Sequence, residues 1–87
     1  MKFHSVFDAL ADTPAQSANL KLRAELLAHI QDTLADMDGT QAELACVCGL
    51  TQPRLNDLLQ GKISKFSLDA LVNINANLGM EVGLVFA

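Results

Sequence analysis

The cysteine and histidine side chains of this sequence are the ones that could bind a metal, take part in redox chemistry or act in catalysis. Cys46 and Cys48 are separated by one residue, and His4 and His29 lie elsewhere in the chain. Side chains two residues apart on a helix point about 200° apart, and no second Cys or His pair completes a zinc site. Neither histidine has a Ser, Cys or carboxylate partner at a catalytic spacing. We therefore expect no metal, no cofactor, no redox centre and no enzymatic activity.

Cationic side chains are concentrated in residues 52–66, and side chains of this kind can bind phosphate groups. Residues 52–66 contain Arg54, Lys62 and Lys65 against Asp57 alone, a balance of +2 that leaves −6 for the remainder of a chain whose net charge is −4. A domain with negative overall charge can still bind nucleic acid through a locally basic face, although its long-range attraction is weaker. This segment is therefore the candidate nucleic-acid contact.

The composition fits one small domain over residues 1–87. The 87 residues are 51% hydrophobic and 18% charged, which is too apolar for a disordered chain. No run reaches the roughly 18–20 consecutive apolar residues of a membrane span. The start of the chain lacks the apolar core and cleavage site of a secretory signal, so we expect an intracellular protein with both cysteines as thiols.

Helical periodicity predicts the elements that position the basic segment. Apolar residues three or four apart indicate a short helix over residues 3–10 and a long one whose apolar stripe covers residues 20–37. Either Thr13 or Asn19 is the expected start of the long helix, and Gly39 is its expected end.

Three shorter helices are predicted between residues 40 and 79. Each begins with a hydroxyl N-cap and ends at a glycine, the pairs being Thr40 and Gly49, Thr51 and Gly61, and Ser67 and Gly79. Thr40 and Glu43 have the spacing of a capping box. The predicted fold is all-α, with about five helices.

The C-terminal residues break the helical pattern. Residues 81–86 are rich in β-branched and aromatic side chains and predict one short strand. Because a lone strand leaves its backbone groups unpaired, we expect it to pair with the same strand of a second chain, through Val82, Leu84 and Phe86. Pairing with the N-terminal segment, or a core strand within one chain, is the alternative. The chain then divides into an N-terminal segment (1–19), a helical core (20–79) and a dimerisation strand (80–87).

Residues 40–55 have the spacing of a helix-turn-helix. A helix of about nine residues is followed, four residues after the small Ala45, by the turn residue Gly49 and then by a second capped helix. Ala45 is small because the second helix crosses close to it, while Leu50 and Leu55 join the two helices in one core. The pattern predicts a fold in which these two helices act as a unit.

On these residues the chain resembles the Cro/Xre-type helix-turn-helix family, and within it the small proteins similar to HigA-type antitoxins. The likeness covers about Leu20 to Leu78 and is sharpest at residues 50–63, LTQPRLNDLLQGKI. Cys46, Val47 and Gly39 depart from the family, which usually has polar residues at the first two positions and a branched aliphatic residue at the third.

The resemblance implies that the second helix of the pair lies in the DNA major groove. It assigns base readout to Gln52, Arg54 and Asn56. Glutamine can form two hydrogen bonds with the edge of adenine, and arginine can form two with the edge of guanine. It places five residues at phosphates: Gln41, Thr51, Lys62, Ser64 and Lys65.

The function implied by the resemblance is that of a homodimeric, cytoplasmic and nucleoid-associated transcriptional regulator on a palindromic operator. It also implies an antitoxin role through contact with a small basic toxin, which the acidic balance outside residues 52–66 supports. Two alternatives stay open: a stand-alone Xre-type repressor, and a protein-interaction module that has lost DNA binding. Asp36 and Asp38, at the end of the long helix where the dipole disfavours acidic groups, have no physical explanation unless they face a basic partner.

Overall fold

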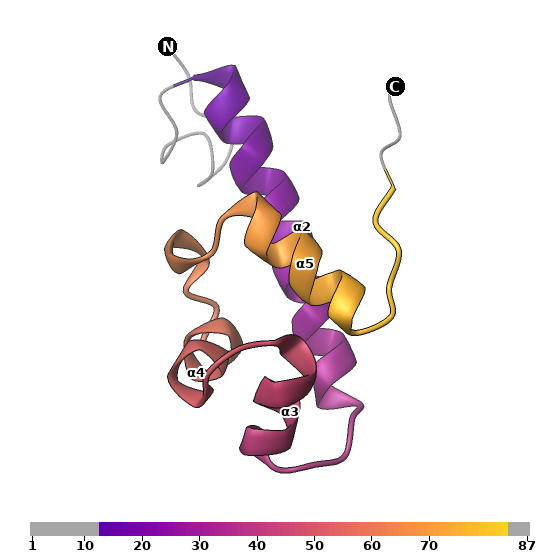
Figure 1. Ribbon diagram of the computed structural model, residues 1–87. Coiled ribbons are helices and arrows are strands. Elements are labelled where there is room, and N and C mark those ends of the chain that lie inside the picture. The colour runs from indigo at the N-terminus through magenta and orange to yellow at the C-terminus, as the bar shows by residue number, and fades with distance from the viewer. Residues whose placement is uncertain (1–12, 84–87) are drawn as a thin grey trace.

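The computed structural model describes residues 13–83 and is all-helical within them (Figure 1). This range contains α2 (Pro14–Ala35), α3 (Gln41–Cys48), α4 (Gln52–Leu59), the 3-10 turn η1 (Ile63–Lys65) and α5 (Leu68–Asn77). The all-α prediction is confirmed with four α-helices in this range, and the short helix predicted over residues 3–10 lies outside it. No helix among the described residues is long and apolar enough to cross a membrane.

Each of the four α-helices starts at a predicted hydroxyl residue, and for α2 the start is Thr13 and not the alternative Asn19. Thr13, Thr40, Thr51 and Ser67 have extended backbone, and the side-chain oxygen of each accepts the backbone N–H three residues later. Glu43 completes the capping box, because its carboxylate accepts the backbone N–H of Thr40 at 3.4 Å. These caps satisfy N–H groups that have no partner inside the helix and so stabilise the helix starts.

Helix α2 ends earlier than the periodicity predicts. It stops at Ala35, whereas the prediction continued it to Gly39. Asp38 therefore lies beyond the helix end, whereas Asp36 is the C-cap of α2 and stays at the negative end of the helix dipole, where carboxylates are disfavoured. Met37 follows the helix and still packs against the core. The early end of α2 thus removes the conflict for Asp38 and leaves it for Asp36.

Helix α2 contacts most of the other elements. It packs along α5 and also touches α4 and η1, while α3 packs on α4 and α5. Figure 1 shows α5 lying across α2, with α3 and α4 gathered toward the C-terminal half of α2. The largest fully buried side chains are Phe66, Ile30, Leu55, Leu58 and Leu71. Burial of each contributes about 1.5–3 kcal/mol. The same cluster includes Ala45 and Cys48 of α3, so one core joins the four helices and the loop after η1.

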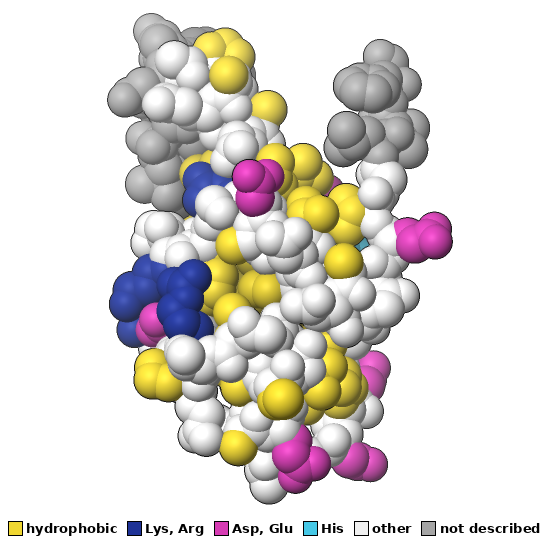
Figure 2. Space-filling model, viewed as in Figure 1, with side chains coloured by type: hydrophobic (Ala, Val, Ile, Leu, Met, Phe, Trp, Pro, Cys, Tyr) yellow, Lys and Arg dark blue, Asp and Glu magenta, His cyan; other side chains and the backbone are white. Residues whose placement is uncertain are grey.

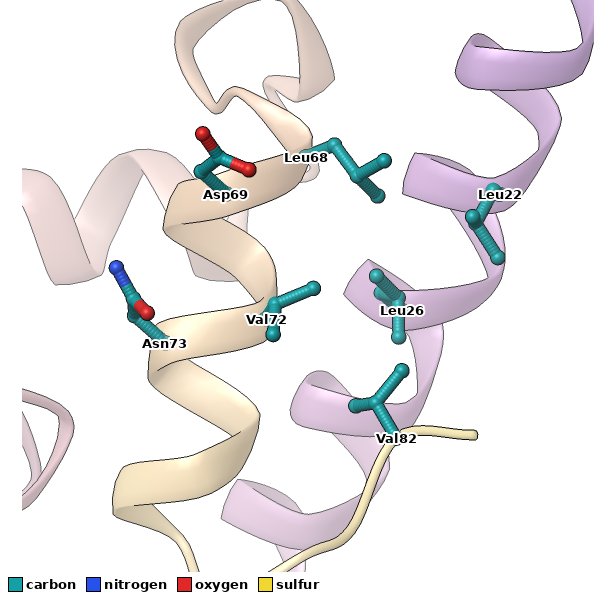
Figure 3. A pocket seen from close by; sticks show the side chains of 7 residues that line it. All are labelled: Leu22, Leu26, Leu68, Asp69, Val72, Asn73 and Val82. Carbon is teal, nitrogen blue, oxygen red and sulfur yellow. The ribbon is translucent and has the colours of Figure 1, made fainter. Parts of the chain in front are cut away.

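The prediction of a C-terminal strand is wrong for the residues that the structure describes. Residues 81–83 have no regular secondary structure, and no strand is present between residues 13 and 83 to pair with them. Within one chain the N–H and C=O groups of residues 81–83 therefore have no strand partner among the described residues. Val82 instead lies at an apolar groove between α2 and α5, lined by Leu22, Leu26, Leu68 and Val72 (Figure 3). Leu84 and Phe86 lie outside the described residues.

Helix α3 ends in a turn that favours glycine strongly. Gly49 has a φ of 73°, in the left-handed region. The N–H of Leu50 donates back to the carbonyl of Ala45 at 2.8 Å, one of the bonds of a Schellman motif. A Cβ on Gly49 would lie 2.9 Å from Nδ2 of Asn77, which itself donates to the Cys48 carbonyl at 2.9 Å. The turn between α3 and α4 is therefore fixed by its own backbone and by α5.

We expect Gly49→Ala to destabilise the protein more than Gly79→Ala. Gly79 has a φ of 81° and open space at the Cβ position, so its substitution carries only the left-handed strain, about 1–2 kcal/mol. Gly49→Ala carries the same strain and also displaces the Asn77 amide, which adds about 0.5–1.5 kcal/mol for the lost hydrogen bond. Urea unfolding of both variants measures the difference. Equal losses of stability would show that the Asn77 contact contributes nothing.

Candidate nucleic-acid interface

Helix α4 and the residue after it expose a stripe of carboxamides. Leu55 and Leu58 are fully buried, whereas Gln52, Asn56 and Gln60 are exposed. The three polar residues are spaced four apart and so lie on one face. Their carboxamides take part in none of the hydrogen bonds formed among residues 13–83. Sequence reasoning found Gln52 and Asn56 but missed Gln60, which the same four-residue spacing could have indicated.

Arg54 is held against the protein. Its Nη1 donates to the carbonyl of Lys65 at 2.9 Å, and its guanidinium lies over the ring of Phe66, 4.3 Å from the centroid. A cation over an aromatic face contributes about 0.5–2 kcal/mol. Sequence reasoning assigned Arg54 to a base, and that contact stays a prediction. The sequence did not predict the contacts of Arg54 within the protein, because Lys65 and Phe66 follow it by 11 and 12 residues.

Asp57 forms ion pairs with both lysines that were predicted to bind phosphate. Its carboxylate lies 3.3 Å from Nζ of Lys62 and 3.5 Å from Nζ of Lys65. Partial burial raises the pKa of the Asp57 carboxyl, but the hydrogen bonds and charges of the two lysines outweigh it and lower the pKa overall. Figure 2 shows the largest group of cationic side chains gathered around an acidic one at one side of the molecule. Both lysine side chains stay about half exposed, so a phosphate can reach them.

Two side chains of α2 hold the end of α4 and the loop behind it. Nε2 of Gln31 donates to the carbonyl of Leu58 at 3.0 Å, and Nη1 of Arg23 donates to the carbonyl of Phe66 at 3.2 Å. These bonds tie α4 and the lysine-bearing loop to the longest helix of the fold. Sequence reasoning missed both residues because 27 and 43 positions separate them from their partners.

The other predicted phosphate contacts lie on the surface. Thr51 accepts the backbone N–H of Arg54 at 3.3 Å as the N-cap of α4. Ser64 is exposed in η1, between the two lysines in sequence, and Gln41 is exposed at the first position of α3. The structure therefore joins Ser64 and the lysines in one loop and places Gln41 on a separate helix.

The cysteines have separate environments. Cys48 is buried in the core, and that burial raises the pKa of its thiol, whereas Cys46 is exposed. A buried thiol with a raised pKa behaves as a small apolar side chain, the role predicted for Cys48. Over residues 13–83 the structure shows no group of three His, Cys, Asp or Glu side chains that could hold a metal ion.

Helices α3 and α4, with the turn at Gly49 between them, form a helix-turn-helix unit. A family model described as a helix-turn-helix domain matches residues 9–86. The chain belongs to the helix-turn-helix domain family. Membership indicates a DNA-binding regulator, and the match includes the whole described range of this helix-turn-helix protein. The curated proteins include no match to it.

We expect Asp57→Asn to remove part of the acid dependence of stability. Because the pKa of the Asp57 carboxyl is lower in the folded chain, the unfolded chain binds more protons on acidification. The ion pairs therefore stabilise the fold above the carboxyl's ordinary pKa, and this contribution is lost as pH falls through the folded pKa. Urea unfolding should show the variant to be less stable than the wild type at pH 7 and should show the two converging toward about pH 2.

The matched control for that experiment is Asp32→Asn. Asp32 is an exposed carboxylate on α2 and forms no ion pair with another residue of the described range. If the gap between Asp57→Asn and the wild type stayed constant from pH 7 to acid, the ion pairs would not be its cause.

Proposed function

We propose that this protein is a sequence-specific transcriptional regulator that binds a palindromic DNA operator as a homodimer. The observation that carries the proposal is the exposed carboxamide stripe of α4 beside the half-exposed lysines of the following loop. Carboxamides recognise base edges, and lysines contact the phosphates that fix the protein's register on the duplex. Both kinds of contact are available on one surface.

The geometry of the helix-turn-helix supports placing α4 in the major groove. The second helix of such a unit enters this groove, about 12 Å wide, and its N-terminal residues contact the bases. Gln52 is the first residue of α4, and Asn56 follows one turn later. Gln41 and the free amides at the start of α3 would then meet a phosphate.

We expect Lys62→Ala and Lys65→Ala to weaken binding to all DNA sequences alike. A lysine that neutralises a phosphate releases about one counterion, so each variant should reduce the slope of log affinity against log salt by about one. Fluorescence anisotropy on the protein's own upstream DNA, at several salt concentrations, measures both effects. A scrambled duplex of equal length reports the binding that is independent of sequence.

Lys21→Ala removes an exposed lysine from α2 and is the matched control, expected to leave the affinity and the slope unchanged. Binding that does not depend on salt would contradict the proposal. So would equal losses in all three lysine variants, because phosphate contact would then not be specific to the loop after α4.

The homodimer is supported by the apolar groove between α2 and α5. Val82, at the groove, is 38% exposed, and the chain continues from it into the apolar sequence Leu84-Val85-Phe86. A palindromic operator has half-sites about 34 Å apart, one turn of DNA, and reading both requires two copies of α4. Exposed apolar surface next to an apolar tail is the type of surface that a second copy of the chain covers.

We expect Val82→Asp to weaken self-association at least about tenfold, equivalent to about 1.4 kcal/mol, because a carboxylate would be desolvated at the contact. Sedimentation equilibrium at micromolar concentrations measures the dissociation constant. Val47→Asp is the matched control, since Val47 is 45% exposed on α3, away from the groove. A wild-type chain that stays monomeric, or equal effects of both substitutions, would contradict the dimer through this segment.

A second role, as the antitoxin of a toxin–antitoxin pair, is favoured by the charge distribution. Residues outside 52–66 carry a balance of −6, and Asp36, Asp38 and Glu43 are exposed around the connection between α2 and α3. Figure 2 shows acidic side chains at one end of the molecule, apart from the main cationic group. Such a surface is complementary to a small basic toxin. A gene for a small basic protein beside this one supports the role, and its absence favours the stand-alone repressor.

A further inference from the structure

We propose that α4 selects A·T over G·C base pairs in its half-site, an inference that rests on the proposed function. The basis is a division among the polar side chains of α4 and the residue that ends it. Those whose chemistry suits a G·C pair are engaged within the protein, and those whose chemistry suits an A·T pair are free.

Arg54 and Asp57 are the residues of α4 that suit a G·C pair. Arginine donates two hydrogen bonds, to O6 and N7 of guanine, and a carboxylate accepts a hydrogen bond from the amino group of cytosine. Arg54, however, donates to the Lys65 carbonyl and lies over the Phe66 ring. Asp57 is paired with the ammonium groups of Lys62 and Lys65. Each would have to leave these partners to reach a base.

The carboxamides of Gln52, Asn56 and Gln60 suit adenine. Each presents a donor and an acceptor that match N7 and the amino group of adenine in the major groove. All three are exposed, and none donates to or accepts from another residue of the described range. At a rise of about 1.5 Å per residue, successive carboxamides are about 6 Å apart along the helix, close to two base-pair steps of about 3.4 Å.

Two apolar side chains border this stripe. Leu59, 38% exposed, follows Asn56 by three residues, and Pro53 is exposed next to Gln52. Exposed apolar groups in the major groove contact the methyl group of thymine, which G·C pairs lack. With Leu55 and Leu58 buried, every exposed and unengaged side chain of α4 therefore matches adenine or thymine.

Selection of bound duplexes from a random-sequence pool, using the full chain and sequencing the product, tests this inference. We expect the recovered half-sites to share A·T pairs. Gln52→Ala and Asn56→Ala should each lose the preference at one position, with discrimination falling about 5- to 150-fold. Because alanine favours helix, both variants should keep the fold, which circular dichroism checks. Asp32→Ala removes an exposed polar side chain from α2, outside the apolar groove, and should leave the selected sequence unchanged.

The outcomes separate this inference from the proposed function. Half-sites that share G·C pairs, with the preference lost in Arg54→Lys, would overturn the inference and leave the regulator intact. Unchanged selection by Gln52→Ala and Asn56→Ala would also overturn the inference alone. Recovery of no common sequence at all would overturn both, because the protein would then not be a sequence-specific regulator.

Discussion

The burial of Phe66 is the constraint on which the position of α4 depends. The ring is 1% exposed and belongs to the core that α2, α4 and α5 share. Arg54 of α4 covers its face, and Arg23 of α2 donates to its carbonyl. An interaction between a cation and an aromatic ring strengthens as water is excluded from it. Phe66 therefore links the long helix, α4 and the loop with the lysines.

This arrangement separates positioning from recognition within a helix of eight residues. Leu55 and Leu58 anchor α4 in the core, and Arg54 joins it to the following loop. The opposite face bears uncharged polar groups that are free of internal partners. The charged groups lie at the margin, in the ion pairs of Asp57 with the lysines. The side chains that hold the helix in place are thus different from those that it presents outward.

Features that depend on neighbouring residues could be predicted from the sequence. The N-caps at Thr13, Thr40, Thr51 and Ser67 follow from hydrogen bonds that span three residues, and the Gly49 turn follows from one backbone conformation. The buried face of α4 likewise follows from helical periodicity. Contacts between distant residues could not be predicted, because no local pattern encodes the bonds from Gln31 to α4, from Asn77 to α3 or from Arg54 to Lys65. The strand prediction was wrong at residues 81–83 because β-branched composition cannot supply a pairing partner.

In the proposed complex with DNA, the ion pairs of Asp57 would also limit how strongly Lys62 and Lys65 bind phosphates. A phosphate that approaches Lys62 or Lys65 replaces an ionic partner as well as water, so its net electrostatic gain is smaller than for two free lysines. Attraction to phosphates does not depend on the base sequence. It therefore contributes to the residence time of a regulator at every non-specific site that it visits before it reaches its operator. In the proposed complex, partly neutralised cations would shorten the time spent at sites of unsuitable sequence, so that contacts with base edges would contribute more to the residence time.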